Sequence, residues 1–391
     1  MEWSDILRKI GIEKTPDELI HSIVDKEELY GLKTHEFKSV LRLHVVLRGH
    51  SQFFEALVDW LERGHRLVIV KGNHDLEWFW PAVRNYLRLD LAERLARRGY
   101  GAVEDVLKNT VLPHVTFIDH AMVIDKELYI EHGHPYDPVT RVLGKNTINE
   151  GQELNIPFGS FFNRYFLNFV ELDYPYIDNI RPTPNILPVM LQKNPLTGLR
   201  VLFNNLIVTL RSMRRGYIRY IFGRDVFWRL LILVCVILGF PIALITYQIT
   251  QEPPAPLPIA VFQWIAVLVI LHISIQLLAR AQLTEPDSLG GFASHRFDDN
   301  PNYRLMTFGH THNVDQFEDR GRWFFNTGTW IPIVQTSTAE IRVDRTFMFL
   351  RIDSENGVVG QGTLQQWCDP AERAERLVLI RRKPIVRPRE R

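Results

Sequence analysis

The sequence predicts an α/β fold interrupted by a pair of membrane-spanning helices. Short segments rich in β-branched residues, such as Arg66–Val70, alternate with amphipathic stretches, such as 34–63, and this alternation is typical of strands and helices packed in layers. Two apolar blocks, Leu230–Ile249 and Leu257–Ala279, each approach the ~20 residues that a helix needs to span a bilayer. With 391 residues, 46% of them hydrophobic, the chain is long enough to bury a sizeable core.

The charge balance and the cysteine count narrow the classes of protein. A formal net charge of +1 and a charged fraction of 23% are typical of neither a disordered chain nor a protein that coats nucleic acid, so we predict no nucleic-acid partner. Two cysteines, Cys235 and Cys368, are too few for a disulfide framework and indicate a reducing compartment.

Local patterns predict the other elements in order. Thr15, Pro16 and Glu18 form a helix start signal, with a capping hydroxyl, a proline in the first turn and an acid. Periodicity and composition predict helices at 34–63, 81–99 and 369–381, and strands at 66–70, 115–118, 121–124, 128–131, 304–308, 323–325, 331–334 and 346–352.

The flanks of the two apolar blocks predict their orientation. The stretch 200–229 carries seven arginines against one acid, Asp225, whereas the link 250–256 has no lysine or arginine. The positive-inside rule then predicts an integral membrane protein with two transmembrane helices and both soluble parts in the cytoplasm. The arginines alternate with aromatic residues, which fits contact with anionic lipid headgroups or, equally, a solvated basic linker. Core helices of a soluble protein are the alternative to the hairpin.

Three predicted strands each end in a glycine-containing loop that bears histidine or asparagine. The loops are Asn73–Asp75, His132–His134 and His310–His312. The strand ends of a rigid sheet present side chains to a common point, and imidazole and amide donors suit divalent Mn, Fe, Co or Zn. A single His-x-His pair is more often structural, but three such loops together favour a metal site.

These loops resemble motifs of the calcineurin-like metallophosphoesterases. Gly72–Asp75 corresponds to that family's Gly-Asn-His-Asp/Glu block, His132–Gly133 to its His-Gly block and Gly309–His312 to its Gly-His-x-His block, in the same order. The resemblance covers roughly residues 1–140 and 300–365. It implies a β-sandwich flanked by helices, here with the transmembrane hairpin inserted, in which loops clamp two divalent metal ions.

The resemblance implies a metal-binding role for four of these side chains. Asn73, His132 and His310 would bind one ion, and His312 would bind the other. The identity of the ions stays open among Mn, Fe, Zn and Co.

The resemblance also implies a catalytic pair. His74 would lie over the phosphate, where it stabilises the transition state or protonates the leaving group, and Asp75 would orient His74. The implied reaction is hydrolysis of a phosphoester, in which a hydroxide held by two metal ions attacks phosphorus.

Two parts of the family's pattern are missing. Its first blocks, Asp-x-His and Gly-Asp-x-x-Asp, occur nowhere in the chain. By the resemblance they supply three ligands of one ion, among them the carboxylate that bridges both ions, so we expect a low metal affinity. Their place in the family's order lies upstream of Met1, and we therefore expect an N-terminally truncated or mis-started chain.

The predicted organisation is one phosphoesterase domain split by an insertion. Its N-terminal part spans 1–140 and lacks its first strands, and its C-terminal part spans 280–368. A helical, basic, membrane-proximal insertion over 141–229 and the transmembrane hairpin over 230–279 lie between them. A C-terminal helix with a basic tail follows over 369–391.

Three functions agree with these patterns. The first is a membrane-anchored, cytoplasm-facing, metal-dependent phosphoesterase, whose substrate is a lipid-linked or membrane-proximal phosphoester because hairpin and loops share one domain. The second is a catalytically inactive relative that acts as a binding or scaffold protein at the membrane, which the missing carboxylates favour. The third is a membrane protein whose histidine motifs are coincidental.

Overall fold

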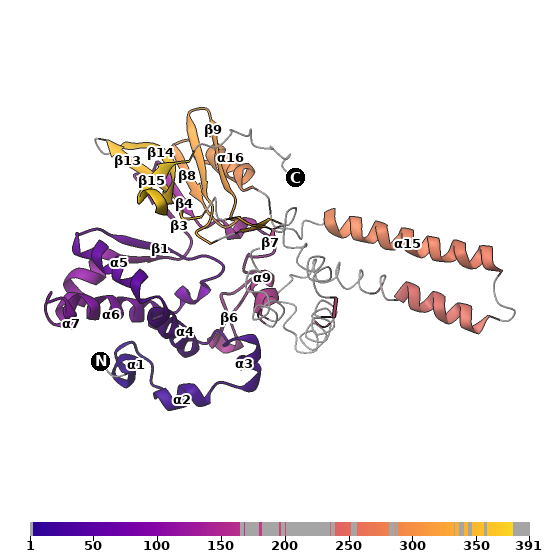
Figure 1. The fold of residues 1–391 in the computed structure, drawn as a ribbon, viewed down its shortest axis with the longest axis horizontal. Helices are drawn as coiled ribbons and strands as arrows, with labels where there is room; N and C mark the ends of the chain where they lie inside the picture. Colours follow the sequence, from indigo (N-terminus) through magenta and orange to yellow (C-terminus); the bar gives the residue numbers. More distant parts are fainter. Residues whose placement is uncertain are drawn as a thin grey trace.

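The structure is a computed structural model, and its fold is mixed α/β, with a five-stranded mixed sheet flanked by helices (Figure 1). The α/β class predicted from the sequence is confirmed. The structure describes residues 3–164, 239–251, 256–280, 288–331, 346–355 and 358–377, with short pieces at 168, 180–181, 195–196, 200, 235, 286, 333–335 and 340–342. The predicted basic insertion over 141–229 and its run of arginines lie largely outside the described residues.

A layer of helices forms the N-terminal part of the fold, in indigo and purple in Figure 1. The side chain of Thr15 accepts from the backbone N–H of Glu18, whose carboxylate accepts from the backbone N–H of Thr15, and this confirms the predicted helix start. The apolar faces share one core, in which Val40 and Leu91 are fully buried. The helices are α1 (Trp3–Lys9), α2 (Pro16–His21), α3 (Asp25–Tyr30), α4 (Glu36–Gly49), α5 (Ser51–Glu62), α6 (Pro81–Arg97), α7 (Val103–Val106) and α8 (Leu112–His114).

Two parallel strands lie against this helical layer. β1 (Leu67–Val70) pairs with β2 (Val115–Ile118), and the chain crosses between them through α6, as parallel pairing requires. The backbone N–H of Lys71 donates to the carbonyl of Ile118 at 2.9 Å, one residue beyond the strand. This bond fixes the point at which the chain turns out of β1 into the loop that carries Asn73.

The five-stranded sheet has the order β3-β4-β8-β10-β9. β4 and β8 run parallel, with Leu128 opposite Leu305 and Ile130 opposite Thr307, although they are far apart in the sequence. Their carboxyl ends therefore lie at the same edge of the sheet. The strands are β3 (Ala121–Ile124), β4 (Leu128–Glu131), β8 (Leu305–Phe308), β9 (Val314–Asp319) and β10 (Arg322–Thr327).

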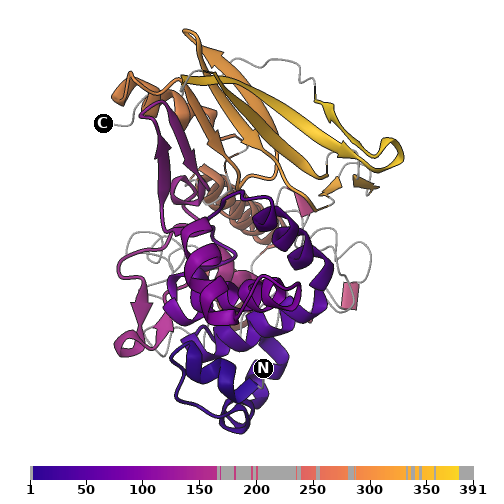
Figure 2. The same ribbon diagram turned by 90° about the vertical axis from the view of Figure 1, so that its left-hand side faces the viewer.

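Both faces of this sheet are covered. Helix α16 (Gly290–Asp299) packs on one face, where Phe297, Phe308 and Phe324 are buried in one cluster. A second sheet of β13 (Met348–Glu355), β14 (Val358–Cys368) and β15 (Arg373–Arg376) packs on the other face through a separate buried cluster. Figure 2 shows these strands in orange and yellow above the helical layer.

Several further described elements are short. They are β5 (Thr147–Ile148), β6 (Glu153–Leu154), α9 (Phe158–Phe162), β7 (Ile180–Arg181), β11 (Ile333–Gln335) and β12 (Glu340–Arg342). β11 pairs with both β12 and β7, so the predicted strand at 331–334 exists but begins two residues later.

The predicted C-terminal helix over 369–381 is wrong in its described part, 369–377. A 3-10 turn over Asp369–Ala371 is followed by Glu372 in the left-handed region, at φ 48°, which reverses the chain. Residues 373–376 then form β15, antiparallel to the end of β14. Pairing with an existing strand outweighs the weak helix preference of this charged segment.

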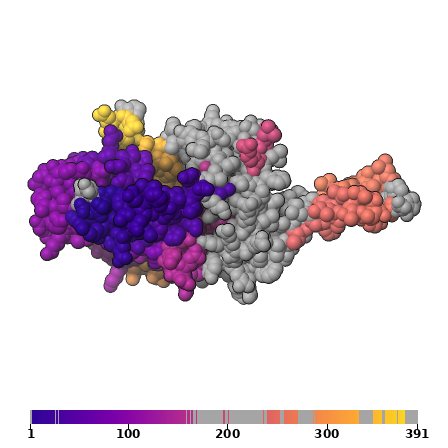
Figure 3. Space-filling model, turned by 90° about the horizontal axis from the view of Figure 1, so that it is seen from below, coloured from indigo at the N-terminus to yellow at the C-terminus, as the bar shows by residue number. Residues whose placement is uncertain are grey.

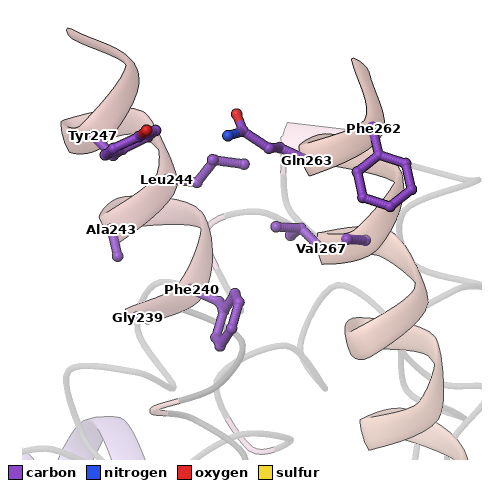
Figure 4. Close-up of a pocket in the computed structure, with 9 residues that line it drawn as sticks. Gly239, Phe240, Ala243, Leu244, Tyr247, Phe262, Gln263 and Val267 are labelled. Atoms are coloured by element: carbon purple, nitrogen blue, oxygen red, sulfur yellow. The ribbon is translucent and has the colours of Figure 1, made fainter. Parts of the chain in front are cut away.

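An arm of two helices projects from the body of the molecule (Figures 1 and 3). Its helices cover 239–250 and α15 (Leu257–Arg280), and Gln248 Nε2 donates to Gln263 Oε1 across them at 3.1 Å. Between them lies a crevice of about 390 Å³ without a charged lining residue (Figure 4). The side chains of Phe262 and Leu268 are 71% and 63% exposed.

The arm corrects the prediction of a transmembrane hairpin. In the part of the chain that the structure describes, no helix is both long enough and apolar enough to cross a bilayer. The integral membrane protein with two transmembrane helices and a catalytic domain on the cytoplasmic side is therefore a wrong prediction.

Candidate metal centre

Three strand ends bring Asn73, His132 and His310 together. Asn73 follows β1, His132 follows β4 and His310 follows β8 after one glycine. His132 Nε2 lies 2.9 Å from Asn73 Oδ1, and His310 Nδ1 lies 3.2 Å from the same oxygen. The two imidazole rings meet edge to face, with centroids 5.4 Å apart. The three predicted ligands of one ion thus surround a single point.

The loop after β1 needs a glycine to reach this point. A Cβ on Gly72 would lie 3.0 Å from His132 Nε2 and 3.1 Å from the Asp75 carboxylate. Asn73 is only 4% exposed, and the hydroxyl of Ser160 donates to its carbonyl at 3.2 Å. The close approach of backbone to imidazole is therefore built into the loop.

His132 is held neutral. Burial, the largest cause, and the neighbouring His310, His134, His74 and His312 together lower its pKa to about 2. A neutral imidazole offers a ring nitrogen lone pair, which is what a metal ion requires.

His310 is constrained on both sides of its ring. Its Nε2 lies 2.9 Å from the Asp137 carboxylate and 3.2 Å from the hydroxyl of Thr140, which turns Nδ1 toward Asn73. Its backbone adopts φ 72°, a left-handed conformation that is uncommon outside glycine, and its side chain is 6% exposed. The contacts around His310 therefore hold its strained backbone conformation in place, as is common at functional sites.

Asp75 closes the loop that carries Asn73 and His74. Its Oδ1 accepts from the backbone N–H of Gly72 at 2.6 Å, and its Oδ2 accepts from the indole of Trp78 at 3.0 Å. Burial raises the pKa of Asp75 above its usual value. The orientation of His74 by Asp75 stays a prediction.

His74 and His312 lie around the central three residues. His74 is exposed, His312 is half-buried, and both are close enough to His132 to lower its pKa. His312, like His310, has a positive φ, at 57°. The structure thus gathers all five predicted histidine and asparagine residues in one region, with Asn73 at the centre.

Three residues of this region were not among the predicted site residues. Asp137 and Thr140, both buried, contact His310, and the His134 ring lies 5.4 Å from that of His132. Burial, followed by the neighbouring His310 and Lys71, lowers the pKa of His134 to about 4, and its Nδ1 has no hydrogen-bond partner among the described residues. No spacing rule links Asp137 to His310 across 173 positions, so only the fold reveals the pair.

The donor set fits one metal ion in part. Two imidazoles and an amide oxygen provide three neutral donors around one point, and the carboxylate on the far nitrogen of His310 is the usual partner of a metal-binding histidine. Among the described residues, however, no group of three or more His, Cys, Asp or Glu side chains could hold an ion. One ion with Asn73, His132 and His310 as ligands is compatible with the site, whereas a second ion at His312 stays a prediction.

Comparison with family models, curated proteins and solved structures finds no match to this chain. The resemblance to the calcineurin-like metallophosphoesterases therefore depends on the three short segments Gly72–Asp75, His132–Gly133 and Gly309–His312 alone.

Proposed function

We propose that the protein is a metal-dependent phosphoesterase whose ion is bound by Asn73, His132 and His310. The observation that carries this proposal is the convergence of His132 Nε2 and His310 Nδ1 on Asn73 Oδ1, at 2.9 and 3.2 Å. These are the residues to which the motif resemblance assigns one ion, and they come from three separate segments of the chain.

The chain's own residues have distinct tasks in this proposal. A bound divalent ion would supply Lewis acidity toward a phosphoryl oxygen and lower the pKa of water. His132 and His310 would bind the ion through ring nitrogens, and Asp75 keeps the loop closed through Gly72 and Trp78. In this proposal the exposed His74 donates a hydrogen bond or a proton to an incoming phosphate.

The proposed substrate is a phosphoester, and no narrower class of substrate is proposed. The lipid-linked substrate depends on the predicted membrane hairpin, and no bilayer-spanning helix is found among the described residues. The contact with anionic headgroups was predicted from the arginine-rich stretch 200–229, which lies largely outside the described residues. The proposal therefore concerns the reaction and leaves the group carried by the phosphate open.

Hydrolysis of a chromogenic phosphodiester and of a chromogenic monoester with Mn²⁺ tests the proposal. We expect Mn²⁺-dependent release of the chromophore, a loss of about 100-fold or more in His310→Ala and a loss of about 100-fold in His74→Ala. His50→Ala, at the exposed junction of α4 and α5, is the matched control and should keep the wild-type rate. Equal rates in His310→Ala and wild type would refute the site.

A second candidate is a binding protein that holds an ion without hydrolysing a substrate. The observation that favours it is the donor set itself, because the atoms that meet at Asn73 Oδ1 are ring nitrogens of His132 and His310 and include no carboxylate. Mn²⁺ binding that is lost in His310→Ala, without hydrolysis of either chromogenic ester, would support this candidate over the enzyme.

A further inference from the structure

The turn that follows His132 surrounds the far nitrogen of His310. It contains Asp137, which is 0% exposed, and Thr140, which is 4% exposed. Asp137 Oδ2 lies 2.9 Å from His310 Nε2, and its Oδ1 accepts from the backbone N–H of Val139 at 2.8 Å. Both carboxylate oxygens are therefore engaged, and the carboxylate has little freedom to move.

Thr140 approaches the same nitrogen from a second direction. Its hydroxyl donates to the carbonyl of His134 at 3.2 Å and lies 3.2 Å from His310 Nε2. A hydroxyl has a single proton, so the oxygen that donates to His134 offers only a lone pair to His310. A carboxylate likewise only accepts.

Two acceptors around Nε2 decide which nitrogen of His310 carries the proton. A neutral imidazole has one N–H, and the hydrogen bonds of one ring nitrogen set the state of the other. With Asp137 and Thr140 accepting, the proton lies on Nε2, and Nδ1 presents a lone pair to Asn73 Oδ1 at 3.2 Å. The lone pairs of this oxygen and of the unprotonated nitrogen repel each other unless a cation lies between them, and a cation there takes both atoms as ligands.

We propose that Asp137 and Thr140 are positioning residues, which hold His310 as its Nε2–H tautomer and aim the Nδ1 lone pair at the point shared with Asn73 and His132. The role of this tautomer in binding an ion rests on the proposed function. The tautomer itself can be measured in the protein without metal. The turn 134–140, in which Asp137 and Thr140 are buried, thereby becomes part of the ion-binding centre.

The tautomer is measured directly by long-range ¹H–¹⁵N correlation spectra of ¹⁵N-histidine-labelled protein without metal. The His310 signals are assigned by their absence in His310→Gln. We expect the Nε2–H form in wild type and a redistribution toward Nδ1–H in Asp137→Asn, whose amide can donate. Mn²⁺ affinity should fall by about 10–100-fold in the same variant.

Thr140→Val is the second variant, because it removes only the hydroxyl from a side chain of the same shape. We expect a shift of the His310 tautomer in the same direction and a smaller loss of Mn²⁺ affinity. Thr140→Val also replaces Asp137→Asn as the test if that variant does not fold. An unchanged tautomer in the folded variants overturns the inference. If wild type binds no Mn²⁺, the proposed function fails while the spectra still decide the role of Asp137.

Discussion

At the scale of single residues, the candidate centre combines neutral donors with constrained backbones. His132 is kept neutral by burial and by its histidine neighbours, and His310 is held at φ 72° between Asp137 and Asn73. The sequence indicated the ligands because glycine, asparagine and histidine follow predicted strands. It could not indicate Asp137, because a carboxylate in a turn has no pattern that distinguishes it from a solvated one.

The close approach at Gly72 makes a first prediction. In Gly72→Ala the new Cβ would lie 3.0 Å from His132 Nε2, so the imidazole must shift by a few tenths of an ångström from its position beside Asn73, and Mn²⁺ affinity should fall by about 10-fold or more. Gly49→Ala, with open space around its Cβ, is the control and should bind Mn²⁺ as wild type does. Equal affinities in Gly72→Ala and wild type, measured by calorimetric titration, would contradict the account.

A histidine away from the centre makes a second prediction, on pH. His44 on α4 bonds the hydroxyl of Tyr86, and burial lowers the pKa of His44 below its ordinary value of about 6.5. As the pH falls through about 6.5, the unfolded chain binds a proton that the folded His44 does not, so the free energy of unfolding decreases.

The variant His44→Gln isolates this contribution. Its free energy of unfolding in urea should decrease less between about pH 7.5 and about pH 5.5 than that of wild type. The exposed His50 provides a control, and His50→Gln should show the pH dependence of wild type. An undiminished decrease in His44→Gln would exclude His44 as its source.

At the scale of elements, strand ends were predicted well and long apolar segments were not. The strands at 115–118, 121–124 and 128–131 are confirmed residue for residue, because turn residues bound short β-branched runs. The segment 369–376 was predicted as helix but forms a turn and β15, because the decision depends on the distant strand β14. The apolar blocks were interpreted as membrane spans from their length, their composition and the arginines beside them, and these features do not distinguish a projecting arm from a membrane span.

A third prediction concerns Gly133, which connects β4 to the turn around His310. Gly133 has φ 102°, and a Cβ there would lie 2.5 Å from Leu289 Cδ1. Gly133→Ala should therefore cost both backbone strain and a clash, about 2–4 kcal/mol of the free energy of unfolding in total. Gly99→Ala, at φ 92° with open space, carries the strain alone and should cost only about 1–2 kcal/mol. Equal losses for the two variants in urea unfolding would show that the clash is relieved at no cost.

At the scale of the whole molecule, the candidate centre exists only because distant segments pair. The parallel register of β4 and β8 places His132 and His310 at one sheet edge, and β1 delivers Asn73 to the same place. The sequence predicted this gathering through the order of three motifs, but their spatial register follows from sheet pairing, which no local pattern encodes. The arm over 239–280 contributes none of these side chains.

The most direct test of the central claim, that Asn73, His132 and His310 form one ion site, is calorimetric titration of the protein with Mn²⁺. The account predicts one ion per chain in wild type and in the exposed-site control His50→Ala, with affinity lost by about 100-fold or more in each of Asn73→Ala, His132→Ala and His310→Ala. Folded variants of all three residues that bind Mn²⁺ as tightly as wild type would contradict it.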